Sequence, residues 1–266
     1  MSRRVLVFVC LFLYSLPLFA KTVIISDLDD TLKKSNSMGK PMEQAYHFLR
    51  KVPYFEMRDL FSEMKGEARK ADEEIRFHYV SAALAMTFKA QAWISKHHFP
   101  AGYSYLKTKE TKAPTYEFKY KTIKTIIERE KQTLAAGDNL HVLMFGDNAQ
   151  VDQLVYSDLK RDLNLDADIF IRDVRCEATF FDSTLPVKRL PDVNYYFSEV
   201  ELFALPAFNF ISNDLRVRTF ASYKKETLVP GYTLKTLERR LESILKDKAQ
   251  AKSEAAQYWK DYYARF

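Results

Sequence analysis

The sequence predicts an α/β fold, a three-layer sandwich with a central parallel sheet. Short apolar runs rich in β-branched residues alternate with longer segments of helical periodicity over the first two thirds of the chain. The 266 residues are 47% hydrophobic and include only six glycines, which excludes disordered and collagen-like proteins. Aspartates lie one or two residues after the ends of two predicted strands, where ligands of parallel sheets bind.

The first two predicted strands flank a long helical segment. Residues 23–26 (VIIS) form a short β-branched run, which is typical of a buried parallel strand. Residues 41–71 carry apolar side chains at helical spacing. Residues 75–81 (IRFHYVS) are predicted to form the second strand, and residues 82–97 are predicted to be helical.

Three further strands alternate with two helices. Residues 103–106 are a weaker third strand, and residues 118–134 place isoleucines and a leucine on one helical face. Residues 140–145 (LHVLMF) form the fourth predicted strand, residues 151–163 a helix and residues 169–171 the fifth strand. Because helices separate most of the strands in sequence, we expect the strands to be parallel.

The first twenty residues are typical of a secretory signal peptide. Arg3 and Arg4 precede an apolar run over residues 5–16, which is short for a membrane span. Pro17 follows this run, and Ala20 offers a small residue for cleavage. An uncleaved N-terminal anchor is the alternative. We therefore expect an exported protein, periplasmic or secreted.

Removal of residues 1–20 would change the charge and the cysteine count. The formal net charge would fall from +6 to +4, since only Arg3 and Arg4 are lost. Cys176 would remain as a lone cysteine, so no intramolecular disulfide is expected. The modest basic surplus does not predict a nucleic-acid partner.

The mature chain divides into three parts. Residues 21–175 form the predicted α/β domain, and residues 176–232, which include four prolines, are expected to be irregular and packed on it. Residues 233–266 are predicted to form a C-terminal amphipathic helix. The aromatic stripe near its end could dock on the domain, contact a lipid surface or mediate dimerisation. The stripe consists of Trp259, Tyr262, Tyr263 and Phe266.

Carboxylates follow the first and the fourth predicted strands. Asp27, Asp29 and Asp30 come after the first strand, and Asp147 and Asp152 come after the fourth. Because parallel strands end at one edge of a sheet, these like charges would repel one another there. A hard divalent cation such as Mg²⁺, with oxygen ligands, would compensate them.

The pattern as a whole resembles the haloacid dehalogenase superfamily. A D-x-D-x-T sequence after a strand, a strand-end serine, a helix-start lysine and G-D-x-x-x-x-D match its four motifs in order. Residues 22–175 also resemble the catalytic domain of the phosphatidate phosphatases first found in actin-patch proteins. The similar segments are SDLDDTLK (26–33), PYFEMRDLFSEM (53–64), HFPAG (98–102), FKYKTIKTII (118–127), FGDNAQVDQLVY (145–156) and IFIRDV (169–174).

The resemblance implies a role for each motif residue. Asp27 would be the nucleophile, and Asp29 would be the general acid and then the general base. Thr31 would support the loop at the phosphate, whose oxygens Ser81 and Lys119 would bind.

Lys121 is an alternative to Lys119, but the family pattern places its lysine four residues before Ile123. Asp27, the backbone carbonyl of Asp29 and Asp147 would bind Mg²⁺, and Asp152 would complete or orient that site.

The expected activity is Mg²⁺-dependent hydrolysis of a phosphomonoester through an aspartyl-phosphate, with phosphatidate as the expected substrate. The alternatives are another exported phosphomonoester (sugar phosphate, nucleotide or phosphoprotein) or a non-catalytic binding protein of the same fold. The second motif departs from the family pattern, because Ser81 is followed by Ala-Ala-Leu-Ala without a proline. The intervals of 54 residues from Asp27 to Ser81 and 38 from Ser81 to Lys119 leave no room for a large cap domain.

Overall fold

The computed structural model describes residues 20–35, 42, 51–174 and 189–225. Residues 1–19 of the predicted signal peptide, Cys176 and the helix predicted over residues 233–266 lie outside the described residues, so those three expectations stay predictions. Among the described helices, none combines the length and the apolar character that crossing a membrane requires.

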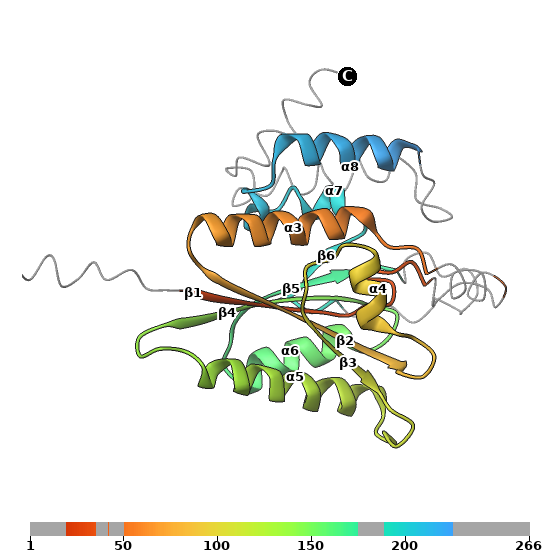
Figure 1. Cartoon of the computed structure of the whole chain (residues 1–266), viewed down its shortest axis with the longest axis vertical. Coiled ribbons are helices and arrows are strands. Elements are labelled where there is room, and N and C mark those ends of the chain that lie inside the picture. The colour runs from red at the N-terminus through yellow and green to blue at the C-terminus, as the bar shows by residue number, and fades with distance from the viewer. Residues whose placement is uncertain (1–19, 36–41, 43–50, 175–188, 226–266) are drawn as a thin grey trace, which may run out of the picture.

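A six-stranded parallel sheet forms the centre of the structure (Figure 1). The strand order is β3-β2-β1-β4-β5-β6, so the direction of winding reverses between β1 and β4. Ligands bind at such a switch point in Rossmann-like sheets. The strands are β1 (Ala20–Ser26), β2 (Glu74–Leu84), β3 (Tyr103–Lys107), β4 (Asn139–Asp147), β5 (Asp166–Arg172) and β6 (Asn194–Tyr196).

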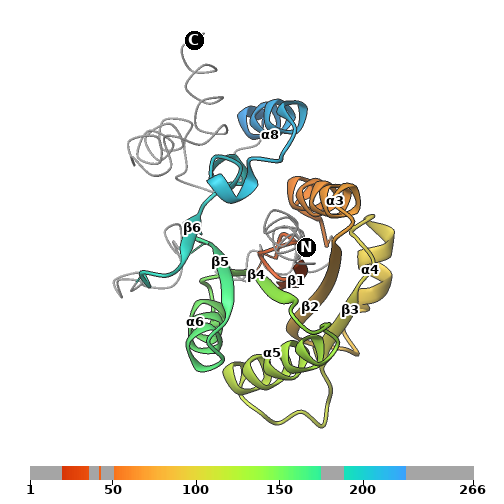
Figure 2. The same cartoon turned by 90° about the vertical axis from the view of Figure 1, so that its left-hand side faces the viewer.

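Helices cover both faces of the sheet, which confirms the predicted three-layer α/β fold (Figures 1 and 2). One face carries α5 (Thr115–Gln132) and α6 (Asp152–Asp162). The other carries α3 (Phe55–Lys70), with α4 (Ala90–Lys96) beside it. The chain then adds α7 (Glu199–Leu202), the 3-10 turn η2 (Pro206–Phe208) and α8 (Asn213–Lys225) above α3.

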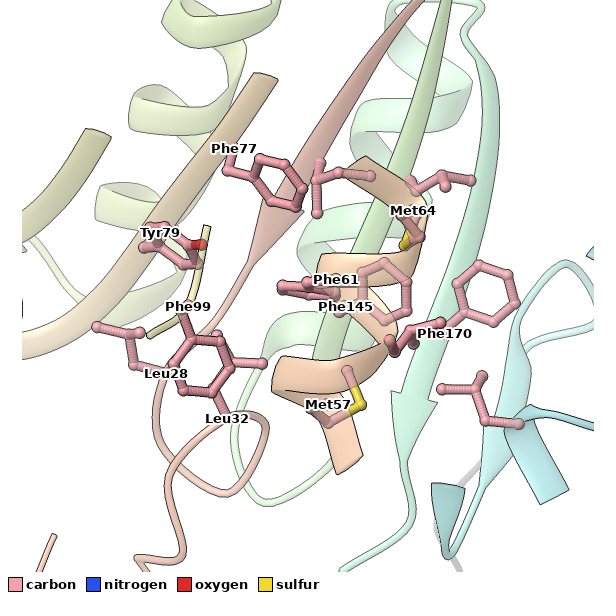
Figure 3. Packing of buried hydrophobic residues seen from close by; sticks show 14 of the residues in the cluster. Leu28, Leu32, Met57, Phe61, Met64, Phe77, Tyr79, Phe99, Phe145 and Phe170 are labelled. Atoms are coloured by element: carbon pink, nitrogen blue, oxygen red, sulfur yellow. The ribbon is translucent and has the colours of Figure 1, made fainter. Parts of the chain in front are cut away.

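Each face of the sheet packs into its own hydrophobic cluster. On β1, Ile24 faces the α3 side, whereas Val23 and Ile25 face α5 and α6. Both faces of the central strands are therefore buried, which explains why β1 shows no polar alternation. In the α3-side cluster, the ring of Phe145 lies 5.2 Å from that of Phe61 and 5.1 Å from that of Phe170 (Figure 3).

The helix predicted over residues 82–97 is shorter than expected. β2 continues to Leu84, residues 85–87 form a turn and α4 spans only Ala90–Lys96. Leu84 pairs with Lys107 on β3, and the Ala85 backbone N–H donates to the Lys107 carbonyl at 2.8 Å. Strand pairing thus overrides the helical propensity of the alanines.

For the helix predicted over residues 41–71, the described residues 51–54 are not helical, and α3 begins only at Phe55. The residues before it pair with the loop that follows β1. Pro53 bridges to Lys33, and the Tyr54 backbone N–H donates to the Leu32 carbonyl at 2.8 Å. Proline also disfavours helical geometry at the residue before it.

The expectation of irregular structure over residues 176–232 differs from the structure in the described range, 189–225. Strand β6 extends the sheet beside β5, and α7 and α8 follow. The segment holds its place because Tyr196, Phe203 and Phe208 are buried in the α3-side cluster. A three-residue strand carries too little periodicity to be recognised in sequence.

Candidate active site

The switch point between β1 and β4 brings the two aspartate motifs together. Ser26, the last residue of β1, pairs with Phe145 on β4, and the Asp27 backbone N–H donates to the Phe145 carbonyl at 2.9 Å. Asp147 ends β4, and Asp152 begins α6 five residues later. The residues predicted from separate motifs therefore share one edge of the sheet.

Three buried carboxylates meet at this edge. Asp27, Asp147 and Asp152 are at most 5% exposed, and each offers an oxygen within 4.8 Å of the others. Carboxylate oxygens gathered this closely fit a hard divalent cation. Within the described residues, they could hold a metal ion.

One buried lysine lies against two of the three carboxylates. The Lys119 ammonium lies 2.8 Å from Oδ1 of Asp27 and 2.5 Å from Oδ1 of Asp152. The alternative, Lys121, is exposed and lies 3.9 Å from Glu117 on its own helix. The geometry therefore places Lys119, and not Lys121, in the site.

One ammonium does not compensate three buried carboxylates. Burial raises the pKa of Asp27 to about 8 against the opposing effect of Lys119, and the charges of Asp152 and Asp29 add to the rise. Burial, together with Asp152 and Asp27, also raises the pKa of Asp147 well above its usual range. A site short of positive charge in this way fits a divalent cation.

The carboxylate of Asp29 lies apart from the other three and has its own partners. Lys33 lies 2.6 Å from its Oδ1, where Ser35 also donates at 2.5 Å, and Ser81 donates to Oδ2 at 3.2 Å. Burial alone would raise the pKa of Asp29, but these partners hold it below its usual range. Metal contact by Asp29 would therefore use its backbone carbonyl, as the family resemblance implies.

The loop after Asp29 is tightly folded. Asp30 has φ 51°, and its backbone N–H donates to the Lys33 carbonyl at 2.7 Å. Thr31 is fully buried, and its hydroxyl has no hydrogen-bond partner among the described residues. A buried hydroxyl without a partner is costly, so Thr31 suits the predicted place beside a phosphate.

Several residues around the site were not predicted from the sequence. The Asn148 side chain, next to Asp147, donates to Asp173 at 2.7 Å, and Arg189 donates to the same carboxylate at 2.6 Å. Tyr195 donates to Gln153, next to Asp152, at 2.7 Å. Lys33 and Ser35, which contact the Asp29 carboxylate, were not predicted either. Of these residues, only Lys33 could have been recognised in the sequence, by its spacing of four residues from Asp29.

Gly146 allows a close approach between β4 and α6. A Cβ added there would lie 2.7 Å from Cβ of Asp152 and 2.8 Å from the ring of Tyr156. Gly146→Ala is therefore expected to displace Asp152 and to destabilise the fold by about 1–3 kcal/mol through overpacking. The phosphate release that the resemblance implies and the affinity for a divalent cation should both fall, as measured by a phosphate-release assay and by calorimetric titration with Mg²⁺.

Gly66→Ala is the matched control, because Gly66 lies within α3 and an added Cβ would meet nothing within 4 Å. That variant should gain about 0.5–1 kcal/mol of stability from helix propensity and keep its activity. Equal metal affinity in Gly146→Ala and the native protein would contradict the packing argument.

Comparison with protein families finds one that matches the part of the chain containing this site. The model of the family described as "Phosphatidate phosphatase APP1, catalytic domain" matches residues 22–173, more than half of the chain. No curated protein and no solved structure matches the chain. The matched range contains all the residues predicted for the site, from Asp27 to Asp152. The chain therefore belongs to the family of the phosphatidate phosphatase APP1 catalytic domain, which is of the haloacid dehalogenase type.

Proposed function

We propose that this protein is an exported, Mg²⁺-dependent phosphatase that hydrolyses phosphatidate to diacylglycerol and phosphate. The observation that carries the proposal is the cluster of Asp27, Asp147 and Asp152 around Lys119, in a chain of a phosphatidate phosphatase family. The export of the protein is inferred from residues 1–20, which are typical of a signal peptide.

In the first step, Asp27 acts as the nucleophile. A carboxylate oxygen of Asp27 forms a bond to phosphorus while the bond from phosphorus to the glycerol oxygen breaks. The Asp29 carboxyl group gives its proton to the departing oxygen, so diacylglycerol leaves as a neutral alcohol. An aspartyl-phosphate remains on the enzyme.

In the second step, Asp29 acts as the general base. Its carboxylate takes a proton from water, and the water oxygen forms a bond to phosphorus. The acyl-phosphate bond then breaks, which releases inorganic phosphate and restores the Asp27 carboxylate. The contacts of Asp29 with Lys33, Ser35 and Ser81 favour the ionised form that this step requires, and they oppose the protonated form that the first step requires. The proton that Asp29 takes from water in this step is the one that it gives to the departing oxygen in the next cycle.

The remaining site residues bind and neutralise the phosphoryl group. Lys119 and the hydroxyls of Ser81 and Thr31 would hold its oxygens, where charge is concentrated in the transition state. Asp27, Asp147 and Asp152, with the backbone carbonyl of Asp29, would hold Mg²⁺. When bound, the ion neutralises carboxylate and phosphate charge and orients the phosphoryl group.

A second candidate is the same chemistry on a different exported phosphomonoester. The observation that favours this candidate is the departure from the family pattern after Ser81. The Ala-Ala-Leu-Ala segment adjoins the phosphate-binding edge, so a change there would alter which substrate the site accepts. A non-catalytic binding role is less consistent with a complete set of acids around a buried lysine.

The test is a phosphate-release assay on the purified protein. Phosphatidate in mixed micelles is compared with glycerol 3-phosphate, a nucleoside monophosphate, a phosphopeptide and an aryl phosphate, each with Mg²⁺ or with EDTA. Mg²⁺-dependent release with the highest kcat/KM for phosphatidate supports the proposal. A higher kcat/KM for a soluble ester would favour the second candidate. If no ester releases phosphate, the proposal that the protein is a phosphatase is rejected.

A further inference from the structure

An apolar turn projects from the carboxyl edge of the sheet beside the candidate site. β2 continues three residues past Ser81 to Leu84, and residues 85–87 form a turn. Leu84 is 39% exposed and Met86 is 62% exposed, within the apolar run of residues 82–86. Single exposed apolar residues are ordinary, but a run of them next to a reactive site suggests a contact surface.

The turn formed by residues 84–87, here called the apolar turn, is fixed by backbone hydrogen bonds. The Ala85 N–H donates to the Lys107 carbonyl at 2.8 Å. The Thr87 N–H and the Phe88 N–H donate to the Leu84 carbonyl at 2.9 and 3.2 Å. The backbone that carries Leu84 and Met86 is thus held at the end of β2 by its pairing with β3. Strand β3 lies at the edge of the sheet, next to β2 (Figure 1).

Residues on both sides of the apolar turn contact the candidate site. Before it, the Ser81 hydroxyl donates to Asp29 at 3.2 Å. After it, the buried ring of Phe88 lies 4.5 Å from the ammonium of Lys33, which pairs with the same Asp29 carboxylate. A ligand that covers the apolar turn therefore lies next to the catalytic carboxylates.

The charges around the apolar turn are mainly positive. Lys89 follows it, and Lys109 and Lys112 lie on the connection that begins where Lys107 pairs with Leu84. All three of these lysines are exposed, and Glu110 is the only acidic residue on that connection. Apolar side chains bordered by lysines complement the surface of an anionic bilayer.

We propose that the apolar turn, together with Lys89, Lys109 and Lys112, is a contact surface for a bilayer of anionic phospholipids. Leu84 and Met86 enter the boundary between headgroups and acyl chains, while the lysines lie at the headgroup phosphates. The proposal deepens the proposed function and rests on it, since a phosphatidate headgroup would reach the site while its acyl chains stay in the bilayer. Two exposed apolar side chains and three lysines are far fewer than the roughly 20–30 residues that each partner contributes to a stable protein interface.

The test measures vesicle binding by the full-length protein in EDTA, so that no turnover occurs. Vesicles of phosphatidylcholine alone are compared with vesicles that also contain phosphatidylglycerol, which is anionic but is not a phosphomonoester. The double variant Leu84→Ser/Met86→Ser is expected to lower the partition coefficient for anionic vesicles about tenfold or more. Val217→Ser is the matched control, because Val217 is 43% exposed on α8 and should bind as the native protein does.

A soluble aryl phosphate, assayed with Mg²⁺, separates contact from catalysis. Native activity on it in the double variant, together with weakened vesicle binding, supports the proposal. Unchanged vesicle binding, or an equal loss of soluble activity, would overturn it. The proposal would also be overturned if the native protein bound no vesicles. The same holds if vesicle binding were lost in the double variant Trp259→Ser/Phe266→Ser and kept in Leu84→Ser/Met86→Ser. If vesicle binding depends on the apolar turn but phosphatidate is not hydrolysed, the proposed bilayer contact is supported and phosphatidate is rejected as the substrate.

Discussion

Asp27→Asn is expected to abolish phosphate release without unfolding the protein. The amide oxygen is a poor nucleophile toward phosphorus, so kcat should fall by at least about 10³-fold with any phosphomonoester. The folded state should not suffer, because Asp27 is 2% exposed and lies beside Asp152 and Asp147. The substitution puts a neutral amide in place of a carboxyl group whose ionised form burial and the neighbouring carboxylates disfavour, while Lys119 keeps its contact with Asp152.

The measurement is a pair of readouts, kcat for an aryl phosphate with Mg²⁺ and Tm in the absence of metal. Asp158→Asn serves as the control on α6, because that carboxylate accepts a hydrogen bond from Tyr116 outside the cluster. The control should keep its kcat. Residual activity of Asp27→Asn above about one tenth of native would reject Asp27 as the nucleophile, and a lowered Tm would show that its charge stabilises the fold.

The sheet and the carboxylate cluster were accessible from the sequence because each has a local signature. Buried parallel strands are short apolar runs, and the residues that follow them must gather at one edge, as Asp27 and Asp147 do. The burial of Lys119 was less evident, since α5 offers Lys121 two residues later. The helical position of Lys119, on the side facing the sheet, distinguishes the two lysines.

Other features were not predictable because they arise from contacts between segments distant in sequence. Arg172 is buried between the rings of Tyr54 and Tyr196 and donates to Glu199 at 2.5 Å. Those partners come from the segment before α3, from β6 and from α7, so no local spacing connects them with Arg172. The extension of β2 past Ser81 has the same origin, since pairing with β3 decides between strand and helix there.

Lys119→Met is expected to make the stability of the protein strongly dependent on divalent metal. The ammonium lies within 2.8 Å of Asp27 and 2.5 Å of Asp152, and its side chain is 3% exposed. Loss of one partner from a buried ion pair costs about 3–5 kcal/mol, because the remaining charges are left uncompensated. In EDTA, the Tm of this variant should therefore lie well below that of the native protein. Mg²⁺ should recover part of the loss, since an ion bound to the carboxylates supplies the missing positive charge.

Lys121→Met is the matched control, because Lys121 lies two residues away on α5 with its side chain 76% exposed. It should change neither the Tm nor the increase in Tm that Mg²⁺ causes. A phosphate-release assay distinguishes the role of the Lys119 charge from that of the metal ion. Mg²⁺ restores stability to Lys119→Met but not phosphate release, because the phosphoryl oxygens still lack their lysine. If Mg²⁺ leaves the Tm of Lys119→Met unchanged, the three carboxylates do not form the metal site, and the cation they need at neutral pH is Lys119 itself.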